Sequence, residues 1–263
     1  MAARGTLIGI GVGPGAPDLI TLRALDRLKS ADVIAIPRSS KYSPSTAWSI
    51  VKPHMEGISG QERLFLTFPM SMDPERVRPA WQEAFIAIGS RLERGLSVAF
   101  ITLGDPLLYS TFIYLLREAP RRWPGLDIEI VPGVTSVTAV PAVSGMALAD
   151  GQERIAIVPA AYGVADLEAT LDAFDTVVLM KIGPEMDTVV QTLERRGLVQ
   201  KAVYVCRATM GGQTIVRDVR EIRQQRGDCF AMMIIAKKSH SGVLLGDVAQ
   251  RQISRASAEE TAP

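Results

Sequence analysis

Three proline-containing glycine turns are the residues of this 263-residue chain best suited to holding a ligand. They are Gly13-Pro14-Gly15, Gly104-Asp105-Pro106 and Pro132-Gly133, and each follows an apolar run typical of a strand. Such turns offer backbone N–H and C=O groups, and the ligands of open α/β sheets gather at the carboxyl ends of strands. Three turns of one kind at three strand ends therefore predict one binding cleft.

The first turn also satisfies a loose dinucleotide-binding fingerprint, Gly11-x-Gly13-x-x-Ala16. In that fingerprint, backbone N–H groups at a helix N-terminus hold the pyrophosphate. Pro14 and Pro17 each lack an N–H where donors are required, and Ile36-Pro37-Arg38 stands where the ribose-binding acid is expected. An NADP-binding reductase stays open as an alternative through Arg38. A tight turn that only needs a positive φ is the purely structural alternative.

An alternation of strands and helices predicts the scaffold that positions these turns. In the first half of the chain, strands are expected at residues 7–12, 33–36, 63–66, 97–102 and 127–131. Helices are expected at 19–30 with Asp18 as the cap, at 78–94 with Gly95 as the stop, and at 111–119, ended by Pro120. The first half is therefore predicted to be an α/β unit around a parallel sheet.

The strand and helix pattern restarts in the second half without a close internal repeat. Strands are expected at 154–158, 176–180, 202–206 and 230–236, and helices at 165–173 and 186–196. Residues 144–151 are typical of a joint between two units. We therefore predict two α/β domains, 1–146 and 147–248, with an active-site cleft between them and a flexible tail over 249–263.

Composition and charge exclude several classes of protein. The chain is 47% hydrophobic and 22% charged, which is typical of a soluble globular protein. Its longest apolar run, 229–236, is too short to span a bilayer, and no signal-peptide pattern is present, so a cytoplasmic location is expected. A net charge of +1 gives no global field that favours nucleic acid. Cys206 and Cys229 are expected to be reduced, buried thiols, and no metal site is predicted.

Arginine is locally dense along the predicted helices. Solvated helix faces explain this density, and contact of some arginines with an anionic ligand is the alternative. The residues concerned are Arg117, Arg121, Arg122, Arg195, Arg196, Arg217, Arg220, Arg223 and Arg226.

Taken in order, the three turns resemble the motifs of the tetrapyrrole methylase family. The segment from Gly11 to Thr21 is similar to the opening signature, Leu103-Gly104-Asp105-Pro106 to the second motif, and Pro132-Gly133-Val134-Thr135-Ser136 to the third. The resemblance covers nearly the whole chain, to about residue 248. It implies two α/β domains around a cleft, commonly in a homodimer. It also implies S-adenosyl-L-methionine as the cofactor, folded up between the domains and held largely by backbone groups.

The family's cofactor-contacting positions can be transferred one by one to this sequence. The resemblance implies cofactor contacts at Pro14, Leu103, Gly104, Asp105, Leu108, Thr135 and Ser136, and in the second domain at Met180 and Ala208. One position departs from the family, because Lys181 stands where many relatives have glycine.

Within the family, the extended string over residues 103–112 resembles the branch that methylates carbon C20 of precorrin-2 in cobalamin synthesis. Phe68-Pro69-Met70 and Ile36-Pro37-Arg38-Ser39 support that likeness. The branch that methylates uroporphyrinogen III carries Tyr-Asp-Arg after the second strand, with the acid proposed as a base. Pro37 occupies the place of the acid here, so no catalytic base is assigned.

The implied reaction is attack by the C20 bridge carbon on the sulfonium methyl, which leaves S-adenosyl-L-homocysteine. The substrate carries eight carboxylates, so cations are expected to line the outer cleft. The candidate substrate-binding residues are Gly13, Arg38, Lys41 and Lys181, with solvated surface cations as the alternative for the three charged ones.

Several interpretations stay open at this point. Tyr109 is either the base that removes the C20 proton or a buried packing residue, and Asp105 is favoured as a turn and cofactor residue over a base. Another tetrapyrrole methylase, including one that acts on cobalt-loaded precorrin-2, is an alternative function. So are a diphthine synthase acting on a protein, an NADP-dependent reductase and a non-catalytic ligand-binding module.

Overall fold

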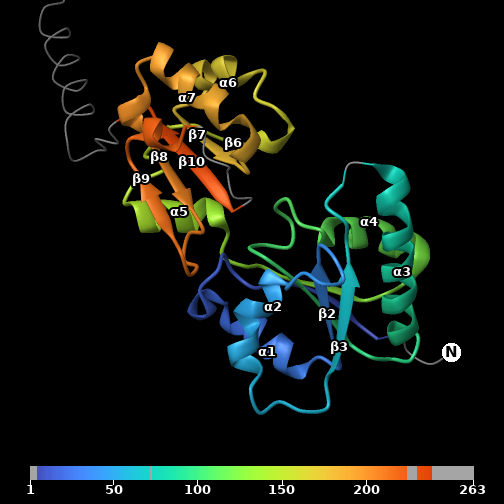
Figure 1. The fold of residues 1–263 in the computed structure, drawn as a ribbon. Helices are drawn as coiled ribbons and strands as arrows, with labels where there is room; N and C mark the ends of the chain where they lie inside the picture. Colours follow the sequence, from blue (N-terminus) through green and yellow to red (C-terminus); the bar gives the residue numbers. More distant parts are fainter. Residues whose placement is uncertain (1–4, 72, 224–229, 239–263) are drawn as a thin grey trace, which may run out of the picture. The chain divides into compact units, whose positions relative to one another are not determined.

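The computed structural model of the chain describes residues 5–71, 73–223 and 230–238 (Figure 1). The chain divides into two compact units, Met1–Ser136 (unit 1) and Val137–Pro263 (unit 2). The predicted domain boundary after residue 146 lies beyond helix α5 (Ser136–Ser144) and stays a prediction. The predicted flexible tail and Cys229 fall outside the described residues.

Unit 1 is built on a five-stranded parallel sheet in the order β3-β2-β4-β1-β5. Every residue of β1 and β4 is buried, because helices cover both faces of the sheet. All five strands point the same way, so their carboxyl ends share one edge. The strands are β1 (Leu7–Gly11), β2 (Val33–Arg38), β3 (Glu62–Thr67), β4 (Val98–Thr102) and β5 (Ile128–Val131).

Two helical layers enclose the sheet of unit 1 (Figure 1). Helices α1 (Leu22–Ser30) and α2 (Thr46–Val51) pack on the face that carries Ile8 and Ile10. Helices α3 (Pro74–Leu92) and α4 (Phe112–Arg122) pack on the opposite face, which carries Leu7 and Phe100. Successive strand residues point to opposite faces, so one strand supplies both cores. Short 3-10 turns lie at Pro17–Leu19 and Lys52–Met55.

Each of the three predicted helices of unit 1 has ends that differ from the prediction. Helix α3 spans Pro74–Leu92 rather than 78–94, because the Asp73 carboxylate caps it by accepting from the Glu75 N–H at 3.0 Å. Helix α1 begins at Leu22, and its cap is Thr21 rather than Asp18: the Thr21 hydroxyl accepts a hydrogen bond from the Ala24 N–H at 3.2 Å, while Asp18 lies in the preceding 3-10 turn. Helix α4 continues through Pro120 to Arg122. A proline in the last turn removes only the hydrogen bond of its own missing N–H, so the helix need not end before it.

Unit 2 holds a mixed five-stranded sheet in the order β6-β7-β10-β8-β9. Only β6 and β7 run parallel, and each of the other neighbouring pairs is antiparallel. Helices α6 (Leu167–Ala173) and α7 (Met186–Arg195) cover one face. The strands are β6 (Ile155–Pro159), β7 (Thr176–Met180), β8 (Ala202–Cys206), β9 (Thr214–Val216) and β10 (Ala231–Ala236), and 3-10 turns lie at Ala160–Tyr162, Gly183–Glu185, Val199–Lys201 and Val219–Ile222.

The predicted α/β fold class is confirmed. Among the α-helices and strands of the described residues, the sequence pattern did not predict α2, α5 and β9. Cys206 packs against the unit 2 core but is half-buried, so the expectation of a fully buried thiol is wrong at this position. Within the described ranges, no helix is long and apolar enough to cross a membrane.

Candidate functional site

The loops that leave β1 and β4 diverge to opposite faces of the unit 1 sheet. Strand β1 leads into α1 on one face, and β4 leads into α4 on the other, although the two strands are neighbours. Ligands of open α/β sheets bind outside the carboxyl ends of the strands at such a switch point. The topology therefore selects the β1–β4 end of the sheet as the candidate site.

The first two glycine turns meet at this switch point and form an isolated antiparallel bridge between Gly13 and Gly104. The Gly104 N–H donates to the Gly13 carbonyl at 2.8 Å, and the Val12 N–H donates to the Thr102 carbonyl at 3.0 Å. Gly13 and Gly104 have φ of +88° and +70°, which L side chains rarely adopt. Both turns thus depend on glycine and form one piece of backbone structure.

The third turn packs against the other two without space for a side chain. A Cβ on Gly133 would lie 2.1 Å from the Gly104 carbonyl oxygen, and one on Gly11 would lie 2.5 Å from the same oxygen. The Gly133 N–H donates to Asp105 Oδ2 at 3.1 Å. The three turns therefore lie together at one edge of the sheet, as the sequence predicts.

Asp105 uses both carboxylate oxygens to hold backbone. Besides the bond from Gly133, its Oδ1 accepts a hydrogen bond from the Leu107 N–H at 2.8 Å. This arrangement supports the interpretation of Asp105 as a turn residue rather than a base.

A hydroxyl pair holds the two ends of the loop that carries Asp105. Thr102 Oγ1 and Ser110 Oγ are 2.9 Å apart, and Ser110 Oγ accepts from the Phe112 N–H at 3.1 Å. Both hydroxyl residues are buried. The sequence analysis did not single out this pair, although Thr102 directly precedes the second motif and Ser110 follows it by four residues.

The structure places seven of the predicted cofactor residues in or beside this cluster. Pro14 and Gly104 are buried, and the other five are half-buried: Leu103, Asp105, Leu108, Thr135 and Ser136. The third loop touches the second, because a Cβ on Gly104 would lie 3.9 Å from the Thr135 Cα.

Tyr109 follows the second motif with a φ of +50° and 45% of its surface exposed. The alternative that it is a buried packing residue is therefore wrong. The phenol of Tyr109 is exposed, so its interpretation as a base stays open.

The remaining predicted residues of unit 2 lie at the carboxyl ends of two strands that flank β10. Met180 ends β7, and Lys181 follows it with a φ of +56°, a backbone conformation that glycine adopts without strain. Ala208 is buried just beyond the end of β8, between Arg207 at φ +55° and Thr209 at φ +64°. The sequence analysis did not single out Arg207, because nothing in its residue type signals a left-handed backbone conformation.

The two predicted cations of unit 1 lie at or after the carboxyl end of β2, on the same edge as the glycine turns. Arg38 is half-buried: its Nε donates to Thr67 Oγ1 at 3.4 Å, and its guanidinium lies 5.2 Å from the centre of the Phe65 ring. Lys41 is exposed in the loop that follows. Beyond Ala35, β2 pairs only with β3, so its last residues are no longer bonded to β4.

The glycine cluster fits S-adenosylmethionine by its donor chemistry. Residues 11–16, 103–110 and 132–136 contain no lysine or arginine, and their one acid is Asp105. A site of backbone dipoles with one carboxylate suits a cationic sulfonium. It lacks the cationic side chains that usually accompany a bound phosphate.

Among the described residues, ion pairs with nearby carboxylates involve six of the nine locally dense arginines. Arg121 and Arg122 pair with Glu118, and a hydrogen bond from Arg121 lowers the pKa of that carboxyl. A hydrogen bond from Arg220 likewise lowers the pKa of Asp218. Further pairs join Arg195 to Glu168, Arg196 to Asp172 and Arg223 to Glu194. These contacts favour solvated helix faces, and Arg226 lies outside the described residues. In the same described ranges, no three His, Cys, Asp or Glu side chains gather into a metal site.

Comparison with known proteins finds one family over most of the chain. Residues 6–222 match the family described as Tetrapyrrole (Corrin/Porphyrin) Methylases. A cobalt-precorrin-2 C(20)-methyltransferase of Salmonella typhimurium is 35% identical over 89% of this chain and 97% of its own length. A Methanocaldococcus jannaschii protein, named as a probable enzyme of the same activity, is 37% identical over 74% of this chain and 82% of its own. The fold matches that of a Thermus thermophilus uroporphyrin-III C-methyltransferase complexed with S-adenosyl homocysteine, with a TM-score of 0.64 and 21% identity, over 89% of this chain and 98% of that one.

Proposed function

We propose a specific methyl transfer for this chain, which belongs to the tetrapyrrole (corrin/porphyrin) methylase family. The enzyme moves a methyl group from S-adenosyl-L-methionine to C20 of precorrin-2, giving precorrin-3A in cobalamin biosynthesis. The observation that carries the proposal is the cluster of three glycine turns, in a chain that matches nearly the whole length of a relative named for C20 methylation of cobalt-precorrin-2.

The cluster supports the proposal through its charge and its rigidity. When bound, S-adenosylmethionine supplies an electrophilic methyl group on a sulfonium. The neutral backbone of Leu103 and Gly104 and the hydroxyls of Thr135 and Ser136 would hold it. Asp105 fixes the second turn against the third, so the donors keep their places. Alignment of two reactants can lower a barrier by roughly 7–11 kcal/mol in favourable cases, and a preorganised cluster provides it.

The proposed cofactor contacts include residues of each unit. They are Pro14 and Leu108 in unit 1, and Met180 and Ala208 in unit 2. Gly13, Arg38, Lys41 and Lys181 take the tetrapyrrole, with the three cations meeting its carboxylates. The proposal includes a homodimer in the cytoplasm and a base for the C20 proton that is not assigned.

The residues of the first turn do not favour the alternative function of an NADP-dependent reductase. Its pyrophosphate would need N–H donors and cations at the first turn, where Pro14 and Pro17 remove donors and residues 11–16 carry no positive charge. Calorimetry with S-adenosylhomocysteine and with NADP separates the two functions. Tight binding of NADP without binding of the homocysteine ligand would refute the methyltransferase.

The names of the two relatives favour a second candidate substrate, cobalt-precorrin-2. Methylation of the metal-free and the cobalt-loaded macrocycle, measured side by side, tests both. The expected product gains one methyl group, seen as a mass increase, at C20, seen by its absorption and nuclear magnetic resonance spectra. Methylation at another carbon, or of neither macrocycle, would refute C20 transfer.

A further inference from the structure

Arg207 shares with Lys181 an uncommon backbone conformation at one edge of the unit 2 sheet. Within the described residues, the non-glycine positions with positive φ are Tyr109, Lys181, Arg207 and Thr209. A left-handed residue other than glycine costs on the order of 1–3 kcal/mol and persists only where its surroundings enforce it. Such strain concentrates at functional sites, so it marks these residues for examination.

The sheet register places Lys181 and Arg207 on either side of the start of β10. The Lys181 N–H donates to the Ala231 carbonyl at 3.0 Å, and the Arg207 N–H donates to the Phe230 carbonyl at 3.1 Å. Strand β10 lies between β7 and β8, and neighbouring strands are about 4.8 Å apart. The two backbones therefore emerge roughly 10 Å apart at the same edge, each with a long cationic side chain.

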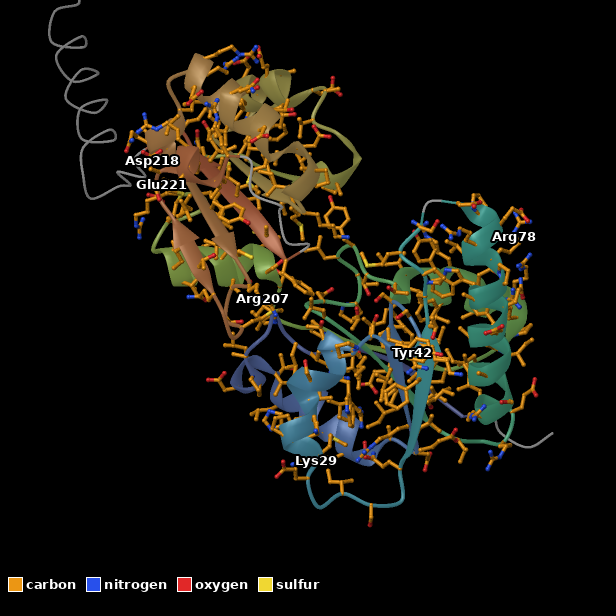
Figure 2. All side chains as sticks on the ribbon, in the orientation of Figure 1. Lys29, Tyr42, Arg78, Arg207, Asp218 and Glu221 are labelled. Atoms are coloured by element: carbon orange, nitrogen blue, oxygen red, sulfur yellow. The ribbon has the colours of Figure 1, made fainter. Side chains whose placement is uncertain are left out.

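The loop after β8 is built to hold Arg207 in this conformation. The Arg207 carbonyl accepts from the Met210 N–H at 2.9 Å, and the Thr209 N–H donates to Gln213 Oε1 at 2.6 Å. The Arg207 side chain is exposed, with its Cδ 4.0 Å from the point where a Cβ on Gly212 would lie (Figure 2). The structure thus fixes the backbone of Arg207 and leaves its side chain exposed at the end of the sheet.

We infer that Lys181 and Arg207 form a two-point site for two carboxylates of the tetrapyrrole substrate, a role that rests on the proposed function. Two cations at a fixed spacing recognise two anionic groups of one rigid macrocycle. An arginine fork takes one carboxylate with two hydrogen bonds, and a lysine ammonium takes the other as a point charge. Arg207 is thereby a substrate-binding residue, and the left-handed backbone at both positions directs the two side chains to that spacing.

Equilibrium binding of precorrin-2 in the presence of S-adenosylhomocysteine tests the site without turnover. The dissociation constant is expected to rise about tenfold in Arg207→Gln and in Lys181→Gln, because each loses a charged hydrogen-bond partner. The affinity for S-adenosylhomocysteine alone is expected to stay unchanged in both. Lys201→Gln is the matched control: it removes one positive charge at the opposite, amino end of β8 and leaves both affinities unchanged.

Glycine variants separate the side chain from the backbone. Arg207→Gly keeps the left-handed conformation without strain, so its thermal midpoint is expected to equal or exceed that of the wild type while precorrin-2 binds as weakly as in Arg207→Gln. Wild-type affinity for precorrin-2 in both Arg207→Gln and Arg207→Gly overturns the site. So does a loss of affinity for S-adenosylhomocysteine in these variants that equals their loss of affinity for precorrin-2. A wild-type protein that binds precorrin-2 without methylating C20 refutes the proposed function and leaves this site supported by the variants. A wild type that binds no precorrin-2 overturns both.

Discussion

Replacing Gly133 with alanine is expected to separate the three glycine turns. The added Cβ would lie 2.1 Å from the Gly104 carbonyl oxygen, a separation that real Cβ atoms essentially never show, and 2.8 Å from the Gly11 Cα. Both neighbours are backbone, so no flexible side chain can give way. The turns must therefore move apart by about 1 Å, which is the overpacking that costs a core typically 1–3 kcal/mol.

The movement also weakens a hydrogen bond of the cluster. The bond from the Gly133 N–H to Asp105 joins the third turn to the second and crosses the interface that opens. That bond contributes about 1 kcal/mol, so the total loss is roughly 3 kcal/mol with the overpacking included. For a unit of this size, that loss lowers the thermal midpoint by about 10 °C.

Tryptophan fluorescence isolates this effect, because Trp48, Trp81 and Trp123 are the three tryptophans of the chain and all lie in unit 1. Gly211→Ala is the control, since a Cβ there meets nothing within 4 Å. We expect Gly133→Ala to lower the tryptophan-detected midpoint and to weaken S-adenosylhomocysteine binding, and Gly211→Ala to change neither. Wild-type values for both quantities in Gly133→Ala would refute the account of the cluster.

Three further changes test neighbouring parts of the argument. Asp105→Asn replaces one acceptor oxygen by an amide NH2 group, so one hydrogen bond from the backbone is lost and the free energy of unfolding of unit 1 falls by about 1–2 kcal/mol. Calorimetry should show weaker S-adenosylhomocysteine binding. An unaltered affinity would contradict the turn role of Asp105. Ser110→Ala leaves the buried Thr102 hydroxyl unpaired, which is expected to lower the free energy of unfolding by about 1–3 kcal/mol. Tryptophan-detected urea unfolding measures this loss, and Ser90→Ala, at an exposed position of α3, is the neutral control. The hydrogen bond from Lys238 holds the pKa of Asp175 at about 2, below its ordinary value of 3.8. The ionised Asp175 therefore stabilises the fold fully above pH 3.8, and this stabilisation is lost as the pH falls towards 2. Asp175→Asn should therefore be less stable than the wild type at neutral pH and equal to it in strong acid, as followed by circular dichroism; a difference that persists in acid would contradict the assignment.

The meeting of the three turns could be predicted from the sequence because it depends on topology. Carboxyl ends of parallel strands share an edge, so glycine turns after β1, β4 and β5 must lie near one another. The details of that meeting depend on contacts between residues far apart in the chain. The bond between Asp105 and Gly133, and the clash that excludes a side chain at Gly11, follow from the register of three strands, which the residue types do not reveal.

Helix α5 shows why some elements escape a sequence pattern. Its residues, Ser-Val-Thr-Ala-Val-Pro-Ala-Val-Ser, are rich in β-branched side chains and include Pro141, so their intrinsic helix propensity is low. Val137 and Val140 are buried, and the carbonyl of Ser144 accepts a hydrogen bond from Arg217. Tertiary contacts therefore stabilise a helix that propensity alone does not favour.

The cap of α1 shows a closer competition. Asp18 and Thr21 are both good capping residues, three positions apart. Pro17 fixes its φ near the helical value and starts a 3-10 turn through Asp18 and Leu19, and the chain is extended again at Ile20. Thr21 is thus the last capping residue before the regular helix, and local turn geometry decides between two equivalent signals.

Lys181 is a residue whose type does not match its backbone conformation. The resemblance to the family implies glycine at this position in many relatives, and the Lys181 backbone has the left-handed conformation that glycine adopts freely. The fold therefore holds a lysine in a conformation that suits glycine better. The conformational propensity of lysine does not explain why lysine stands here instead of glycine. Nor does the backbone hydrogen bond to Ala231, which any residue other than proline could make. The two-point substrate site that we propose would explain it, and Arg207 has the same backbone conformation across β10.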